Sequence, residues 1–201
     1  QLNVQRTMAR RQEEAKGIEV MGKPELSAFF TLIEYTPHPK QLIVHQSKER
    51  FRVLCTGRRF GKSLLASREA LFSILTPDKR GWIVAPNYEL AKKVFREVMI
   101  LANTYFKSFI LSQSASMAYI KLKNGSELYC KSADNPVGLL GEGLDFLIID
   151  EAASIKREVW EEFLRPTLAD RQGWALFIST PKGKNWFFEE YTRGQDRKIK
   201  T

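Results

Sequence analysis

The sequence predicts an α/β domain with a mostly parallel central sheet flanked by helices. Short apolar runs, each the length of a buried strand, recur along the chain, and segments between them carry apolar residues at helical spacing. The 201 residues are 43% hydrophobic and 27% charged, which is ordinary composition for a globular chain with a sizeable core. The expected strands are Phe51–Cys55, 81–85, 146–149 and 174–178.

Two helices and a hairpin are expected between these strands. The first helix covers 63–75 and ends at Thr76-Pro77-Asp78, and the second covers 89–101. The hairpin covers 118–129 and turns at Lys123-Asn124-Gly125-Ser126. Apolar residues that share a helix face are Leu64, Leu71, Ile74 and Leu75 in the first helix, and Leu90, Val94, Val98 and Leu101 in the second.

The flanks of this core differ from it in composition. Residues 1–22 are polar and basic, so we expect a flexible or partly helical arm. We place the core at 23–181 and the start of a lid or linker subdomain at 182–201. Because the chain starts at Gln1 and ends in a basic tail, we expect it to be a piece of a longer protein.

Charge and cysteine content bound the class of protein. The formal net charge is +9, of which residues 1–60 carry +5, residues 61–181 carry +1 and residues 182–201 carry +3. Basic flanks fit a polyanion partner such as nucleic acid, and they fit a solvated basic surface equally well. No apolar run reaches the roughly 18 residues of a membrane span, and no signal peptide is visible, so no membrane role is expected. Two isolated cysteines, Cys55 and Cys130, indicate a reducing compartment.

A phosphate-binding loop follows the first strand. A loop of this kind needs small residues, a helix N-terminus, a lysine for the phosphate charge and a hydroxyl for Mg²⁺. Gly61, Lys62 and Ser63 supply the last part of this pattern, whereas the leading glycine position holds Thr56 and Gly57 comes one residue late. The predicted nucleotide-binding residues are Thr56, Gly57, Arg58, Arg59, Phe60, Gly61, Lys62 and Ser63, together with Gln41 upstream.

Two carboxylates complete the prediction of an ATPase site. The apolar run 146–149 ends in Asp150 and Glu151. Asp150, with Ser63, is expected to hold Mg²⁺. Glu151 is expected to orient and polarise the attacking water, as a general base does. The order and spacing of the phosphate loop and the acidic pair therefore predict a P-loop NTPase fold (RecA-like, ASCE class), with a site that binds ATP and Mg²⁺.

Two further motifs narrow the prediction. Gln41, in Pro37-His38-Pro39-Lys40-Gln41, has one donor and one acceptor that could pair with the adenine edge. Ser179 and Thr180 follow the last strand, and their hydroxyls could sense the γ-phosphate and couple its loss to a neighbouring subdomain.

With these motifs the sequence resembles the ATPase domain of the terminase large subunit, the genome-packaging motor of tailed bacteriophages. The resemblance is carried over residues 35–190 by PHPKQLIVHQS, the deviant Walker A CTGRRFGKS, WIVAPNYELA, the Walker B FLIIDEAA and STPKGKNWF. It implies ATP-driven translocation of double-stranded DNA into a prohead, in the host cytoplasm, by a homo-oligomeric ring on the portal protein that also meets the small terminase subunit. In isolation the domain could be a monomer. The family's C-terminal nuclease is expected to lie outside these residues.

One position departs from the family. Related members carry an arginine finger before a glycine upstream of Walker B, and here Leu140 occupies that place. Arg58, acting within its own subunit, is the first candidate for the missing cation and is therefore counted as catalytic with Glu151 and Lys62. Candidates acting on a neighbouring subunit are Arg157, Arg165 and Arg171.

Two other functions remain open from the residues alone. A DEAD-like helicase shares the glutamine motif and the Asp-Glu pair but normally needs a second RecA-like domain. A nucleotide-gated scaffold with little turnover is the alternative that is not an enzyme. His38 and His45 are expected on the surface of the helix that carries Gln41, and the aromatic residues Trp160, Trp174, Trp186, Phe187 and Phe188 are expected in packing roles.

Overall fold

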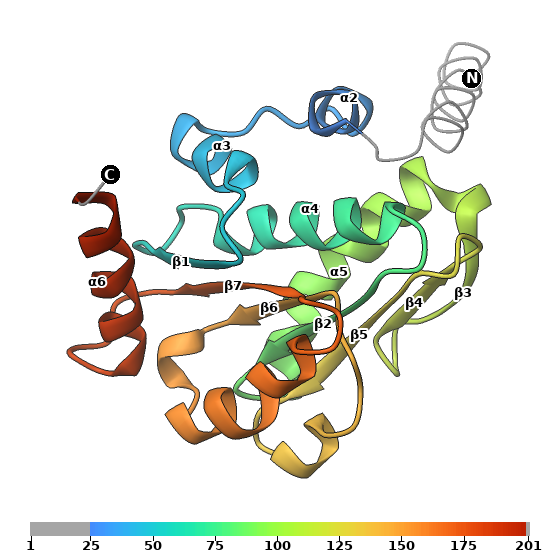
Figure 1. The fold of residues 1–201 in the computed structure, drawn as a ribbon. Helices are drawn as coiled ribbons and strands as arrows, with labels where there is room; N and C mark the ends of the chain where they lie inside the picture. Colours follow the sequence, from blue (N-terminus) through green and yellow to red (C-terminus); the bar gives the residue numbers. More distant parts are fainter. Residues whose placement is uncertain (1–24, 200–201) are drawn as a thin grey trace.

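A computed structural model describes residues 25–199, which form a seven-stranded sheet in the order β1-β7-β6-β2-β5-β4-β3 (Figure 1). The five strands from β1 to β5 in this order run parallel, and β4 and β3 continue the sheet in antiparallel pairs. The strands are β1 Phe51–Cys55, β2 Arg80–Ala85, β3 Ile110–Ser114, β4 Tyr119–Leu122, β5 Glu127–Ser132, β6 Phe146–Asp150 and β7 Trp174–Ser179.

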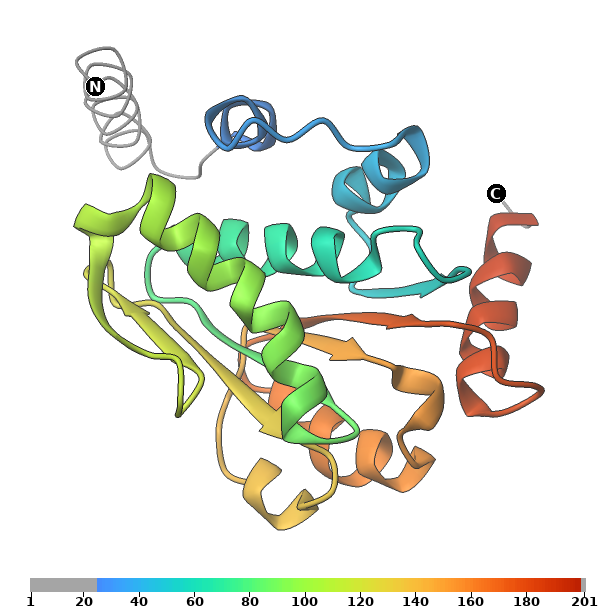
Figure 2. The same ribbon diagram turned by 180° about the vertical axis from the view of Figure 1, so that it is seen from behind.

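Helices cover one face of the sheet and short helical turns cover the other (Figures 1 and 2). The first face carries α2 Leu26–Leu32, α3 Pro39–Gln46, α4 Lys62–Leu75 and α5 Tyr88–Tyr105, with the turn η1 Lys107–Phe109 after α5. The second face carries η2 Pro136–Leu139, η3 Ala152–Ser154, η4 Val159–Leu164 and η5 Arg165–Leu168. The last helix, α6 Trp186–Ile199, lies beside β1 at the edge of the sheet.

The central strands are apolar throughout because both of their faces are buried. In β6, Phe146 and Ile148 pack into the core under the long helices, whereas Leu147 and Ile149 pack into the core under the short turns. Strands buried on both faces are expected to be continuous apolar runs rather than alternating ones. This double burial explains why the sequence identified these strands.

The predicted α/β class, its four strands, both helices and the hairpin are confirmed. The hairpin is not a separate insertion, because its second strand pairs in parallel with β2 and so extends the main sheet. Strand β3 was not predicted. In α4, Leu65 is fully buried, and Leu64, expected on the core face, lines a cavity beside the phosphate loop instead.

The proposed domain boundaries stay predictions. The N-terminal arm at 1–22 lies outside the described residues. After residue 181 the chain still contributes to the core, since Trp186 and Phe187 are buried in the cluster under the short turns. Within 25–199, no helix is long and apolar enough to cross a lipid bilayer.

Candidate nucleotide-binding site

The candidate site lies where three neighbouring strands end. Cys55 of β1 pairs with Ser179 of β7, and Ile178 of β7 pairs with Asp150 of β6, so these strands end at one level. The N–H of Thr56 donates to the carbonyl oxygen of Ser179 at 3.2 Å and ties the phosphate loop to β7. In open parallel sheets, ligands bind outside the carboxyl ends of the strands. The topology therefore brings the loop, the acidic pair and the Ser-Thr motif to one edge.

The loop wraps around the lysine that the sequence singled out. The Lys62 ammonium donates to the carbonyl of Gly57 at 2.8 Å and to that of Thr56 at 3.4 Å. Gly61 precedes α4 with φ 85°, a left-handed conformation that glycine adopts without steric cost. Since α4 begins at Lys62, its unpaired N–H groups and positive dipole end face the loop. An arrangement of this kind suits an anion such as a phosphate.

Asp150 is a buried acid at the tip of β6. Its side chain is almost inaccessible, and burial raises its pKa from 3.8 to about 6, with the nearby Glu151 charge acting in the same direction. The N–H of Glu151, at 2.9 Å from Oδ1, and the charges of Lys62 and Lys93 act in the opposite direction. A carboxylate with so little protein compensation is a group that a bound cation would stabilise.

Glu151 turns the chain away from the strand. It has φ 50°, a left-handed conformation that is costly for a residue with a side chain and is often found at functional sites. Its carboxylate lies 3.6 Å from the ammonium of Lys182, which also donates to the Ser154 hydroxyl. The acid predicted to position water thus faces a cation from the segment after β7.

A cavity of about 580 Å³ lies beside these groups. Predicted site residues from three segments line it, namely the phosphate loop, Glu151 of the acidic pair and Thr180 of the Ser-Thr motif, whereas Asp150 and Ser179 are not part of the lining. The lining residues are Arg58, Arg59, Gly61, Lys62, Ser63, Leu64, Pro86, Leu90, Glu151, Ser154, Thr180 and Lys182.

Gln41 does not line this cavity. Its side chain is buried, its amide nitrogen donates to the Phe60 carbonyl at 3.0 Å, and its amide oxygen accepts from the His38 N–H at 2.9 Å. Both ends of the amide are therefore bonded to protein, and one of the bonds reaches the phosphate loop. Recognition of adenine by Gln41 stays a prediction.

Two hydroxyls at the strand ends are buried without a partner. The Thr56 and Ser179 oxygens make no hydrogen bond within the described residues. A buried hydroxyl without a partner costs free energy, and such groups recur where a protein must respond to a ligand. The coupling role of Ser179 and Thr180 remains a prediction, which the unpaired hydroxyl of Ser179 supports.

The four candidate arginines occupy different places. Arg58 lines the cavity. Arg157 pairs with Glu161 at 2.7 Å and Glu189 at 2.9 Å, and Arg171 pairs with Asp145 at 3.0 Å. Arg165 lies in a second hollow, of about 850 Å³, beside β1. Of these four arginines, Arg58 is the one that lines the cavity, and its catalytic role stays a prediction.

The sequence missed Lys182 and Ser154 as members of the site. The available signal was the position of Lys182, two residues after Thr180 in a motif already identified.

The expectation that both histidines lie on the surface is confirmed for one and wrong for the other. His38 is exposed and caps α3, but His45 is buried, 7% exposed, because its ring pairs with Glu69 of α4.

The residues present suit Mg²⁺. No group of three or more His, Cys, Asp or Glu side chains in residues 25–199 could cage a metal, so a protein-only metal site is not found there. Mg²⁺ is usually held by one or two protein oxygens together with substrate phosphates and water. Asp150, with its buried carboxylate, and Ser63, in the cavity wall, have that donor chemistry.

The strand order, the loop and the acidic pair define the class of the protein, a P-loop NTPase with a RecA-like fold. The family model described as "Terminase large subunit, T4likevirus-type, N-terminal" matches residues 53–200, and the chain belongs to this family.

Known proteins agree with this assignment. The chain is 42% identical over 184 residues to the terminase large subunit of Thermus virus P23-45, and 36% identical over 167 residues to that of Escherichia phage T5. These alignments cover 83% and 80% of this chain, which spans 38% of the length of each relative. The structure of the Thermus phage P74-26 large terminase ATPase domain matches with a TM-score of 0.76 and 40% identity, covering 83% of this chain and 73% of that one.

Proposed function

We propose that this chain is the ATP-hydrolysing motor domain of a viral terminase large subunit. The observation that carries the proposal is the cavity in which Lys62, Arg58 and Glu151 meet at the ends of β1, β7 and β6. Support comes from the family and from the similar ATPase domain of Thermus phage P74-26.

Each residue has a role that its position supports. The Lys62 ammonium would leave the Gly57 carbonyl for the β- and γ-phosphates, which offer stronger, charge-assisted hydrogen bonds. Glu151 would orient the attacking water and accept its proton. Arg58 would stabilise charge on the transferring phosphoryl group.

Lys182 adds a second control on Glu151. Its ammonium lies 3.6 Å from Glu151, and both line the cavity. A γ-phosphate in the cavity would compete for this ammonium and release the Glu151 carboxylate for the water. The pair would thus keep the base occupied until nucleotide is bound.

Ser63 and Asp150 would hold Mg²⁺, which supplies positive charge to the phosphate oxygens. The protein prepares this site by burying Asp150 with a raised pKa of about 6. Deprotonation of Asp150 at neutral pH makes it available as a ligand.

The coupled work and the partners are proposed from the family. We propose translocation of double-stranded DNA into a prohead, by a homo-oligomeric ring on the portal protein that receives DNA with the small terminase subunit. The site of action would be the prohead in the host cytoplasm. The net charge of +9 is compatible with DNA as the partner.

Mg²⁺-dependent ATP hydrolysis by the purified chain tests the proposal. Lys62→Ala should abolish measurable hydrolysis and weaken ATP binding, whereas Lys107→Ala, an exposed lysine near the far edge of the sheet, should match wild type. The rate per subunit should also be followed against protein concentration. A flat rate supports Arg58 acting in its own subunit, and a steep rise indicates an arginine from a neighbour. Absence of both ATP binding and hydrolysis would refute the proposal.

A further inference from the structure

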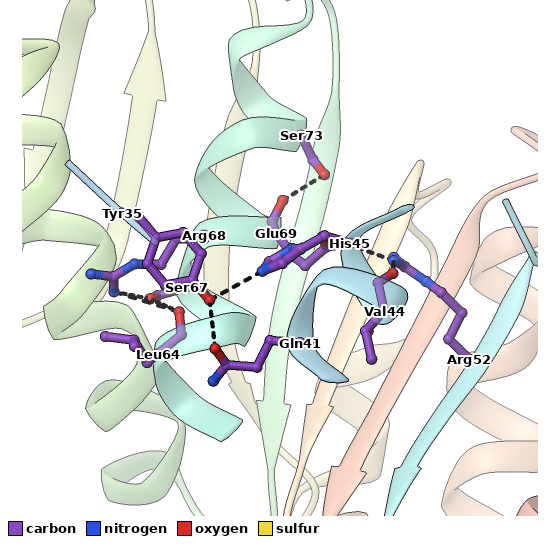
Figure 3. A network of polar contacts seen from close by, with 10 residues as sticks. All are labelled: Tyr35, Gln41, Val44, His45, Arg52, Leu64, Ser67, Arg68, Glu69 and Ser73. Atoms are coloured by element: carbon purple, nitrogen blue, oxygen red, sulfur yellow. Dashed lines mark hydrogen bonds and ion pairs between the residues drawn. The ribbon is translucent and has the colours of Figure 1, made fainter. Parts of the chain in front are cut away.

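A buried polar cluster lies between α3 and α4, and the chemistry described above does not use it (Figure 3). It joins Tyr35, Gln41 and His45 to Glu69 of α4 and Arg52 of β1. Gln41, His45 and Glu69 are each less than 8% exposed. Buried polar groups cost free energy unless their contacts are satisfied, so a cluster of this size calls for an account of its contacts.

One half of the cluster is ionic. His45 Nδ1 lies 2.6 Å from one carboxylate oxygen of Glu69, and Arg52 Nη1 lies 2.7 Å from the other. The Arg52 guanidinium also donates to the Val44 carbonyl at 2.9 Å and stacks on Trp174. Glu69 is therefore fixed from both sides, and it fixes the His45 ring in turn.

The other half of the cluster reaches the phosphate loop. The Tyr35 hydroxyl lies 3.3 Å from His45 Nε2 and 3.2 Å from the Gln41 amide oxygen. The Gln41 amide nitrogen donates to the carbonyl of Phe60 at 3.0 Å. We call Glu69, His45, Tyr35 and Gln41, in this order, the relay. It links α4 to the backbone that precedes Gly61 and Lys62.

Tyr35 is the member that joins the two halves of the cluster. Its hydroxyl donates to the Gln41 amide oxygen, which can only accept. Both ring nitrogens of His45 are engaged, Nδ1 with Glu69 and Nε2 with the Tyr35 hydroxyl. His45 and Glu69 therefore reach Gln41 through Tyr35.

The groups around His45 support this arrangement. Burial raises the pKa of Tyr35, so its hydroxyl keeps the proton that the relay needs. Phe30 of α2 meets the His45 ring edge-on at 4.9 Å and brings no charge. The charged groups on the packed elements are Glu69 and Arg68 of α4, Arg52 of β1 and Glu97 of α5, which lies 3.5 Å from Arg68.

We propose that Tyr35, His45 and Glu69 are positioning residues of the nucleotide site, which hold the phosphate loop through Gln41. A loop held in its binding conformation pays less conformational free energy when ATP binds. Loss of one contact of the relay should then weaken ATP binding. The kinetic consequence rests on the proposed ATPase function, whereas the link between His45 and the loop does not.

Tyr35→Phe tests the relay with little risk to folding, because it removes one hydroxyl and keeps the ring that packs on Phe30. The KM for ATP should rise about two- to tenfold, the range expected from the net loss of one hydrogen bond, with kcat little changed. Tyr129→Phe is the matched control, since it removes a partly buried hydroxyl bonded to Glu127 away from the cavity, and it should behave as wild type.

NMR of the nucleotide-free chain provides the arm that does not depend on ATPase function. Tyr35→Phe should move the Gly61 amide signal away from its wild-type position, whereas Tyr129→Phe should leave that signal unchanged. The relay is refuted if the Gly61 signal of Tyr35→Phe matches wild type, if both tyrosine variants move it alike, or if both change KM alike.

Discussion

Gly61→Ala perturbs the point where the phosphate loop, α4 and Gln41 meet. Gly61 has φ 85°, and a Cβ built on it would lie 2.7 Å from the Gln41 amide nitrogen. An alanine in the left-handed region costs about 1 kcal/mol. Displacement of the Gln41 amide removes its bond to the Phe60 carbonyl, which is worth about 1 kcal/mol net. Together the substitution should destabilise the chain by about 2 kcal/mol.

A second glycine separates the two contributions. Gly141 has φ 87°, and a Cβ there would meet no atom within 4 Å. Gly141→Ala should therefore cost only the backbone strain, about 1 kcal/mol. The difference between the variants, again about 1 kcal/mol, measures the contact with Gln41.

Urea unfolding of both variants and wild type, followed by far-UV circular dichroism, provides the free energies. Gly61→Ala should also lower Tm by about 4–8 °C for a chain of this size. If Gly61→Ala is no more destabilising than Gly141→Ala, the Gln41 amide does not hold the loop as described.

Three further predictions concern the charged groups of the site. Asp150→Asn should stabilise the nucleotide-free chain at pH 7.5 by about 2–3 kcal/mol, because burial raises the pKa from 3.8 to about 6 and the wild type loses stability as the pH rises through that interval. The gain should vanish near pH 3.8, and a gain that is the same at all pH values in urea unfolding would contradict the burial argument. Lys182→Met should change stability by less than about 0.5 kcal/mol, because the ion pair with Glu151 is well exposed. The same substitution should lower kcat for ATP hydrolysis by about tenfold or more. An unchanged kcat would show that Lys182 takes no part in hydrolysis. Arg58→Ala should lower kcat by about 10³-fold and Leu140→Arg should alter it little, and a large gain in Leu140→Arg would indicate a finger from a neighbouring subunit.

The sequence predicted those parts of the fold that depend on local pattern. Strands β6 and β7 are buried on both faces, so each is a short continuous run of apolar residues that the sequence shows directly. Strand β3 was missed because exposed residues alternate in it with partly buried ones, and because it pairs only with β4, at the edge of the sheet. An edge strand of this kind carries little hydrophobic signal.

The motifs of the site were predictable from order and spacing, but its contacts were not. Lys182 meets Glu151 only because β6 and β7 are neighbours, and the sequence does not encode that adjacency locally. Burial of His45 depends on Glu69, which lies 24 residues further along the chain, so a polar side chain on a short helix was expected to face solvent. The hydrogen bond between the Gln41 amide and the Phe60 carbonyl likewise became visible only in the folded structure.

Glu151→Gln tests the central claim, ATP hydrolysis at this cavity, most directly. The variant keeps the size and hydrogen-bonding capacity of the side chain but removes its basicity, so ATP should still bind with the wild-type Kd, while hydrolysis should fall by about 10²-fold or more. Glu158→Gln, an exposed glutamate beyond the cavity, serves as the control and should hydrolyse ATP at the wild-type rate. Turnover by Glu151→Gln within about tenfold of wild type would contradict the assignment of the base.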